Sequence, residues 1–82
     1  MEEAKLLETI LAQIGDNRKS KGYSAQYMAD KMYMSKDSYR ALEKGRVAMT
    51  LERFVQITQV LEEDPSTFFQ TCWVKAGGPA LK

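Results

Sequence analysis

The sequence contains no histidine, one cysteine and two prolines. Histidine is the commonest metal ligand and the commonest general acid–base group, so its absence excludes most metal sites and most triad-type active sites. The single cysteine, Cys72, cannot form an internal disulfide, which fits a reducing cytoplasm or leaves the compartment undecided. No hydrophobic run approaches the roughly 18 residues that a membrane-spanning helix needs. We therefore expect no metal, no cofactor and no membrane partner.

The length of the chain sets a second limit. At 82 residues it can form one small domain, and a domain of this size buries only about 60% of the surface of its unfolded chain, which disfavours a large catalytic cleft. No serine, tyrosine or acid has a visible activating partner, so we do not expect an enzyme. We expect a single domain over residues 1–75 and a flexible tail over residues 76–82, which contains the Gly-Gly-Pro of 77–79.

Charge is unevenly distributed along the chain, although the net charge is only +1. Residues 1–15 carry a net charge of −2, residues 16–46 one of +4 and residues 47–82 one of −1. A basic middle between acidic ends is typical of a surface that faces a polyanion, because phosphate binding needs local positive charge rather than a high overall isoelectric point. A solvated helix face would give the same pattern, so charge alone leaves both interpretations open.

Apolar residues recur with a helical period along most of the chain, and no stretch shows the alternation of a β-strand. This pattern predicts an all-α fold, a compact five-helix bundle. The predicted helices cover residues 2–20, 24–31, 35–44 and 50–62, and a fifth runs from Pro65 through Phe69. The residues predicted to cap helix starts are Ser24, Ser35, Thr50 and Asp64. The residues expected to face inward are Leu6, Leu7, Ile10, Leu11, Ile14, Met28, Ala29, Met32, Tyr39, Leu42, Leu51, Phe54, Val55, Thr58 and Leu61.

The second and third predicted helices form the most informative pair. Only Met32, Tyr33 and Met34 separate them, which is too few residues for an antiparallel hairpin but suits a near-perpendicular helix-turn-helix. Such a unit needs a small residue where the two helices touch, and Ala29 stands at that place. It also needs apolar residues at set positions, which are filled by Met28, Met32, Met34, Tyr39 and Leu42. The alternative is a generic helical hairpin.

The segment Tyr23–Arg46 resembles the lambda-repressor-like, Cro/XRE-type helix-turn-helix family. Glu43-Lys44-Gly45 stands at the Glu-x-Gly signature of that family, and Arg18 stands where the family usually has the arginine that pairs with this glutamate. The similarity extends over about residues 5–70. It implies a cytoplasmic, nucleoid-associated transcriptional regulator of bacterial or phage type, which binds double-stranded DNA as a two-fold homodimer.

The pairing of Arg18 with Glu43 also has a physical rationale. A bidentate bond between the guanidinium and the carboxylate would fix the junction of the first and third helices and leave other arginine donors near a phosphate. We therefore expect a structural ion pair. The alternative is an exposed pair worth only about 0–1 kcal/mol.

The third helix, about residues 35–44, is the predicted recognition helix. Its outward side chains are expected to read bases in the major groove, while its flanks and the preceding helix contact phosphates. The predicted base contacts are Lys36, Asp37, Arg40 and Ala41. The predicted phosphate contacts are Arg18, Lys19, Ser24, Gln26, Ser35, Ser38, Lys44 and Arg46. Ser24 and Ser35 could instead serve only as caps, and Lys19 could be merely solvated.

Three residues depart from the family pattern. Ala25 stands where the family often has glutamine, and Tyr33 replaces the usual turn glycine, which carries a steric penalty if its φ angle is positive. Asp37 places an acid near the start of the recognition helix, where it repels phosphate but can accept a bond from cytosine N4. Asp37 and Tyr33 favour the alternative function, a protein-interaction module such as an antitoxin-like or adaptor subunit on the same scaffold.

The C-terminal part of the domain carries a group of bulky side chains. We expect them to form a self-complementary dimer interface, with Trp73 as its best candidate. The residues predicted at this interface are Phe68, Phe69, Cys72 and Trp73. The alternative for Phe68 and Phe69 is that they only close the core of the monomer.

Overall fold

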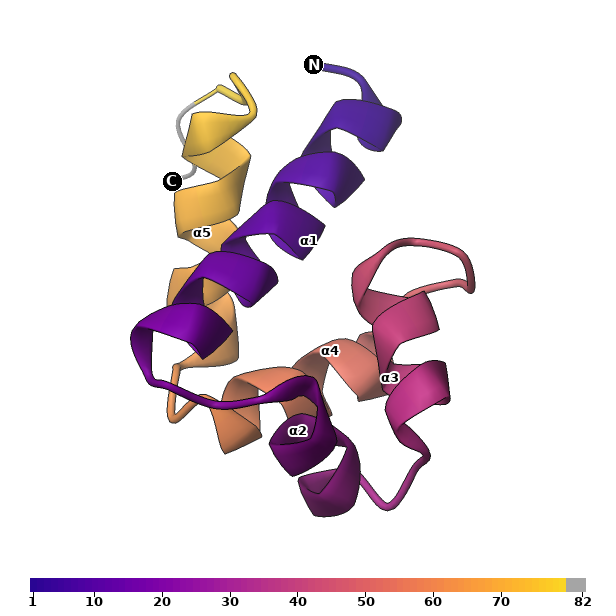
Figure 1. Cartoon of the computed structure of the whole chain (residues 1–82). Coiled ribbons are helices and arrows are strands. Elements are labelled where there is room, and N and C mark those ends of the chain that lie inside the picture. The colour runs from indigo at the N-terminus through magenta and orange to yellow at the C-terminus, as the bar shows by residue number, and fades with distance from the viewer. Residues whose placement is uncertain (80–82) are drawn as a thin grey trace.

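The predicted pattern of helices is confirmed by the structure, a computed structural model that describes residues 1–79. Five α-helices follow one another, and the described residues contain no strand (Figure 1). They are α1 (Glu3–Ser20), α2 (Ala25–Lys31), α3 (Lys36–Glu43), α4 (Leu51–Val60) and α5 (Pro65–Lys75). The first four predicted helices have boundaries within two residues of those observed, because most of the periodic apolar positions that define them lie in or against one shared core.

Four of the five helices begin at a polar side chain whose oxygen accepts a backbone N–H of the first turn. This contact satisfies a donor that the helix itself leaves unpaired. The caps are Ser24, Ser35, Thr50 and Asp64, which accept from the N–H groups of Tyr27, Ser38, Arg53 and Ser66. All four caps were predicted, and they fix where the chain turns into each helix.

All five helices end in one backbone motif. A residue with positive φ follows the helix, and its N–H and that of the next residue bond back to carbonyls of the last turn, as in a Schellman motif. Glycine fills the left-handed position after α1, α3 and α5. Tyr33 after α2 and Glu62 after α4 adopt the same conformation with φ of 56° and 59°, where an L-residue is strained. Tyr33 therefore takes the conformation in which its steric penalty applies.

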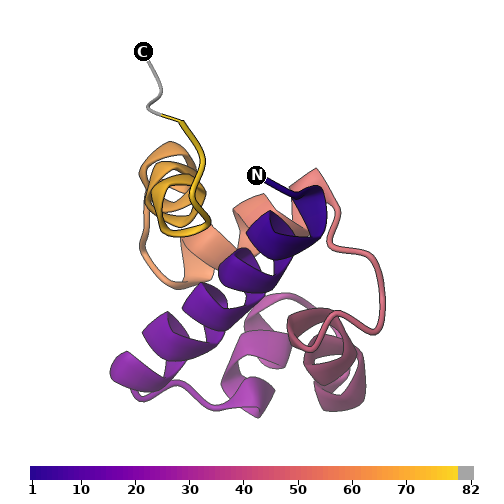
Figure 2. The ribbon, with the colours of Figure 1, turned by 90° about the horizontal axis from the view of Figure 1, so that it is seen from above.

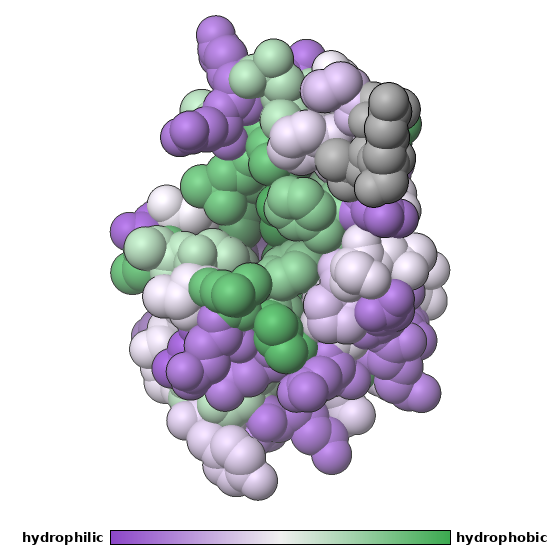
Figure 3. Space-filling model, turned by 180° about the vertical axis from the view of Figure 1, so that it is seen from behind, coloured by the Kyte–Doolittle hydropathy of each residue, from purple (hydrophilic) through white to green (hydrophobic). Residues whose placement is uncertain are grey.

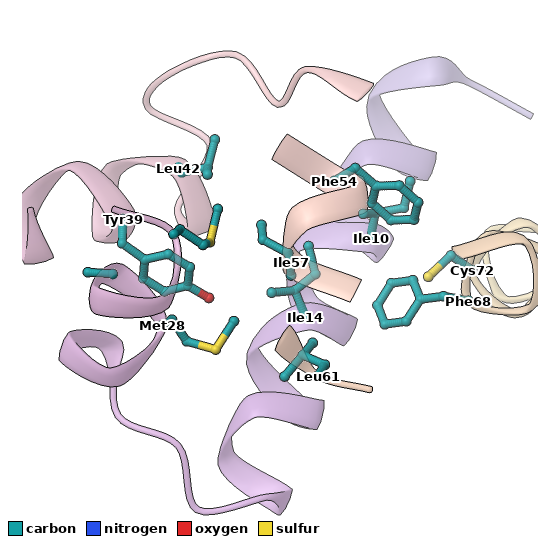
Figure 4. Packing of buried hydrophobic residues seen from close by; sticks show 12 residues of the cluster. Ile10, Ile14, Met28, Tyr39, Leu42, Phe54, Ile57, Leu61, Phe68 and Cys72 are labelled. Atoms are coloured by element: carbon teal, nitrogen blue, oxygen red, sulfur yellow. The ribbon is translucent and has the colours of Figure 1, made fainter. Parts of the chain in front are cut away.

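One hydrophobic core joins all five helices (Figure 4). Viewed from above, α1 lies between α5 on one side and α3 on the other (Figure 2), and it contacts both. Two short helices, α2 and α3, pack closely on each other, and they cover the core through contacts of α3 with α1 and of α2 with α4. Its largest fully buried side chains are Ile14, Met28, Tyr39, Leu42, Ile57, Thr58, Leu61 and Cys72.

Two leucines predicted to face inward are exposed instead. Leu51 is 78% exposed and Leu7 is 42% exposed. Leu51 is the first residue of α4, and together with Leu7 of α1 it lines an open groove between α1, α4 and α5. The helical period places both side chains on the apolar faces of their helices, but within the described residues no other helix covers these faces at the groove.

The predicted dimer interface on α5 is wrong for two of its four residues. Cys72 is completely buried and Phe68 is 5% exposed, because this face of α5 packs against α1 and α4. Burial also raises the pKa of the Cys72 thiol. Phe69 and Trp73 are half-buried, with ring centroids 6.0 Å apart. Of the four predicted interface residues, these two are the ones whose side chains are accessible to a partner.

The start of the predicted tail packs against α5. Ala76 is buried, and the indole N–H of Trp73 donates to the carbonyl of Pro79. Gly78 lies so close to the indole ring that a Cβ on it would come within 2.6 Å of ring atoms. Residues 80–82 of the predicted tail lie outside the described residues.

Neither a membrane-crossing helix nor a metal-binding cluster is found in the described part of the chain. None of its helices combines the length and apolar character that crossing a bilayer requires. Groups of three or more histidine, cysteine, aspartate or glutamate side chains that could hold a metal ion do not occur there either.

The strained turn leads to a first prediction. Replacing Tyr33 by glycine should raise the free energy of unfolding by about 0.5–1 kcal/mol, because the relief of the left-handed strain exceeds the extra entropy of glycine in the unfolded chain. Tyr33 is 98% exposed, so removing its side chain removes no packing contacts of the core. Thermal unfolding followed by circular dichroism would show a melting temperature higher by a few degrees.

A matched control is Ala12→Gly, at an exposed position inside α1. Glycine there should lower stability by about 1 kcal/mol, since the backbone is right-handed. A Tyr33→Gly variant that is destabilised like the control would contradict the assignment of strain.

Candidate nucleic-acid interface

Helix α3 presents two different faces because α2 covers only one of them. Tyr39 and Leu42 are buried in the core, whereas Lys36, Asp37 and Arg40 are exposed to solvent. The helix lies at the edge of the bundle, next to the loop that leads to α4 (Figure 1). The exposed face therefore combines two cations and one carboxylate on a short, rigidly supported helix.

The Glu43 carboxylate at the end of α3 accepts three hydrogen bonds. Arg18 of α1 donates from Nε to Oε2 and from Nη2 to Oε1, both at 3.0 Å, and the Tyr39 hydroxyl donates to Oε2. Arg18 and Glu43 are each 15% exposed. Gly15 lies directly beside this carboxylate, since a Cβ there would be 3.1 Å from Oε1. The pair is thus bidentate, mostly buried and closely packed.

The ionisation of these groups follows from the same contacts. Hydrogen bonding to Glu43 raises the pKa of Arg18 and outweighs the desolvation that lowers it. Burial, followed by the bond to Glu43, raises the pKa of the Tyr39 phenol well above its usual value of 10.0. Tyr39 therefore stays a neutral donor, and Arg18 stays charged.

Arg18 connects three segments of the chain. Besides its two bonds to Glu43, it donates from Nη1 to the carbonyl of Tyr23, which lies in the loop between α1 and α2. A guanidinium has five N–H donors, so two remain for another acceptor. Arg18 thus fixes α3 relative to α1 and still offers a partly exposed cationic edge.

That cationic edge opens into a hollow of about 480 Å³ on one side of α3. Three positively charged side chains line it, and they come from α1, from α3 and from the residue after α3. The cations are Arg18, Arg40 and Lys44, and the other lining residues are Ser24, Ala25, Tyr39 and Glu43. The structure therefore brings together four of the residues predicted to contact DNA, and their chemistry suits a phosphate group.

A second hollow, of about 450 Å³, lies along the other side of α3. Asp37, Ser38 and Ala41, three of the residues predicted to contact DNA, line it from α3. The same hollow is lined by Val47 of the following loop and by Arg53 of α4, which the sequence analysis did not identify. Both lie beyond the helix-turn-helix segment. For Arg53 the available signal is its place next to the inward-facing Phe54 on the predicted helix over residues 50–62, whereas Val47 carries no such signal.

The remaining predicted contacts are spread over the exposed surface of the motif. Ser24 and Ser35 act as helix caps, so the hydroxyl of each already accepts a backbone N–H. Ser35 donates to the Ser38 hydroxyl, and the amide of Gln26 donates to Asp30 at 2.8 Å. The cations among these contacts, Lys19, Lys36 and Arg46, are exposed. Only Gln26 is engaged with an acid, which reduces its availability to a phosphate.

Comparison with known proteins gives one match. A family model described as helix-turn-helix, of the Cro/C1 type, matches residues 14–68, about two thirds of the chain. The matched region contains Arg18, Glu43 and the whole of α2, α3 and α4. Comparisons with curated proteins and with solved structures gave no significant match.

The buried carboxylate leads to a second prediction. Glu43→Ala should lower the free energy of unfolding by about 2–4 kcal/mol, because it leaves the Arg18 guanidinium and the buried Tyr39 hydroxyl without their acceptor. Chemical denaturation of the variant measures this loss directly.

Tyr39→Phe is the matched control, since it removes one bond and leaves the ion pair intact. It should cost about 1 kcal/mol. Equal midpoints for wild type and Glu43→Ala would refute a stabilising role for the pair.

Proposed function

Because the chain belongs to the Cro/C1-type helix-turn-helix family, whose domains bind DNA and are not enzymes, we propose that it is a sequence-specific transcriptional regulator. In this proposal α3 enters the major groove of double-stranded DNA, and two copies bind two half-sites related by a two-fold axis. The exposed cationic face of α3 is the observation that carries the proposal.

The spacing on α3 supports direct reading of bases. Lys36 and Arg40 lie one helical turn apart, so both point from the same exposed face. Each can donate to O6 and N7 of a guanine, and Arg40 can do so in a bidentate manner. Asp37 between them can accept from the amino group of a cytosine, and Ala41 is small enough to contact a thymine methyl group. This set predicts preference for a G·C-containing half-site.

The cationic hollow supports binding to the backbone. Arg18 and Lys44 line it from different elements, and hydrogen bonds to Glu43 and to the carbonyl of Tyr23 hold the Arg18 side chain in place. The charge distribution agrees, because the net charge of +4 falls in residues 16–46, which contain α2 and α3. A phosphate placed there would fix the register of α3 in the groove.

One observation favours the second candidate, a protein-interaction module. Tyr33 projects fully into solvent from the turn between α2 and α3 and keeps a strained backbone. An aromatic side chain in this setting suits a protein partner. Such a module would bind duplex DNA weakly and without sequence preference, so the experiment below separates the two functions.

The third prediction concerns affinity for duplex DNA. Selection from random duplexes should yield a preferred site, and binding to that site should weaken with salt at a log–log slope of about −4 to −7, as expected for roughly 4–8 phosphate contacts. Arg40→Ala should weaken binding to that site by about 1–3 kcal/mol and relax the preference at one base pair.

Two control variants separate loss of sequence preference from a general loss of DNA affinity. Lys44→Ala should weaken binding to all sequences alike and reduce the salt slope by about 1. Lys5→Ala, near the start of α1, should have little effect on either quantity. If Arg40→Ala weakens all duplexes equally, Arg40 does not read bases. A slope near zero for the wild type would reject DNA binding.

A further inference from the structure

The face formed by α1, α4 and α5 carries a groove that plays no part in the DNA-binding surface. The groove has a volume of about 570 Å³, and apolar side chains gather around it (Figure 3). No charged residue lines it among those that the structure describes. The lining residues are Leu7, Ile10, Met49, Thr50, Leu51, Phe54, Val55, Pro65, Ser66, Phe69 and Gln70.

We propose that this groove is the dimer interface and that it receives Leu51 from a second copy of the chain. The inference rests on the proposed function for its two-fold axis. It keeps Phe69 of the predicted α5 interface, which lines the groove, and leaves out Phe68 and Cys72, which are buried. Exposed apolar surface of this kind usually marks an interaction site.

The shape of the surface favours a second copy as occupant. A two-fold interface is self-complementary, so one surface must supply both the projecting group and the recess. Leu51 projects, being 78% exposed, and the groove beside it is the recess. Leu51 of each copy can therefore enter the groove of the other, between Leu7 of α1 and Phe69 of α5.

The absence of charged residues from the groove lining also favours a second copy as occupant. In a two-fold dimer, residues near the axis meet their own copies, so a charged lining would place like charges together in a desolvated contact. The polar groups in this groove are limited to Thr50, Ser66 and Gln70, which are neutral. Two copies can approach here without burying a charged side chain of the groove lining, whereas a nucleic acid finds no cation in that lining to bind.

The position of the groove agrees with the spacing of DNA half-sites. Recognition helices one helical turn of DNA apart are separated by about 34 Å, so each lies roughly 17 Å from the axis. The interface must therefore lie close to α3. Thr50 meets this condition, because it lines both the groove and the hollow beside Asp37 and Ala41 of α3.

The test compares two exposed apolar residues that receive the same charge. Leu51→Asp places a carboxylate in the groove, and at the first position of α4 it favours the helix dipole. Val74→Asp adds the same charge at a 65% exposed position of α5 that does not line the groove. Both variants are first compared with wild type by circular dichroism to establish that they are folded.

Sedimentation equilibrium without DNA tests the interface by itself. Wild type and Val74→Asp should self-associate to dimers as the concentration rises to the millimolar range, and Leu51→Asp should stay monomeric or dimerise at least tenfold more weakly. Equal association of all three proteins, or a monomeric wild type over the whole range, would overturn the proposal.

Binding to DNA then separates the interface from the proposed function. On a duplex with a single half-site from the selected sequence, all three proteins should bind alike. On the full two-fold site, wild type and Val74→Asp should bind cooperatively, and Leu51→Asp should lose at least tenfold in affinity. Cooperativity that survives in Leu51→Asp counts against the groove. If no duplex is preferred by any protein, the DNA-binding proposal fails, and the sedimentation result still decides the interface.

Discussion

The arrangement of α1 and α3 depends on one mostly buried carboxylate. Glu43 accepts two bonds from Arg18 and one from Tyr39, and Gly15 leaves the space in which it sits. Helix α3 has only eight residues, too few to be stable alone, so its orientation comes from contacts with other helices. The bond to α1 at its C-terminal end and the packing of Tyr39 and Leu42 hold it in place. A short helix held in this way can keep its outer face free for a ligand.

The helices were predictable because local and tertiary preferences agree. The apolar period and the capping side chains identify the same helix boundaries, as expected for a sequence whose local preferences agree with its tertiary packing. The ends of α2 and α4 lack the usual glycine signal. Tyr33 and Glu62 occupy positions where glycine is the usual signal, and only the tertiary structure shows that they adopt the same left-handed conformation. Their strain is set by the packing of neighbouring helices, which a local pattern does not contain.

The exposed face of α3 was predictable because a helical period determines it. Lys36, Asp37 and Arg40 are exposed because Tyr39 and Leu42 are buried on the same helix. Contributions from other elements were missed, since sequence spacing does not show that Arg53 of α4 shares a hollow with Asp37. Phe68 and Cys72 of α5 were misassigned for a related reason. Hydrophobic composition shows that a residue favours burial, but it does not show whether its own chain or a second one covers it.

The contact between Trp73 and the residues after α5 has a practical consequence. Trp73 is the single tryptophan of the chain, and its indole lies against Gly78 and bonds to Pro79. Its intrinsic fluorescence therefore reports the local environment of residues 78–79, which follow α5. Emission can follow release of these residues from α5 without any added label.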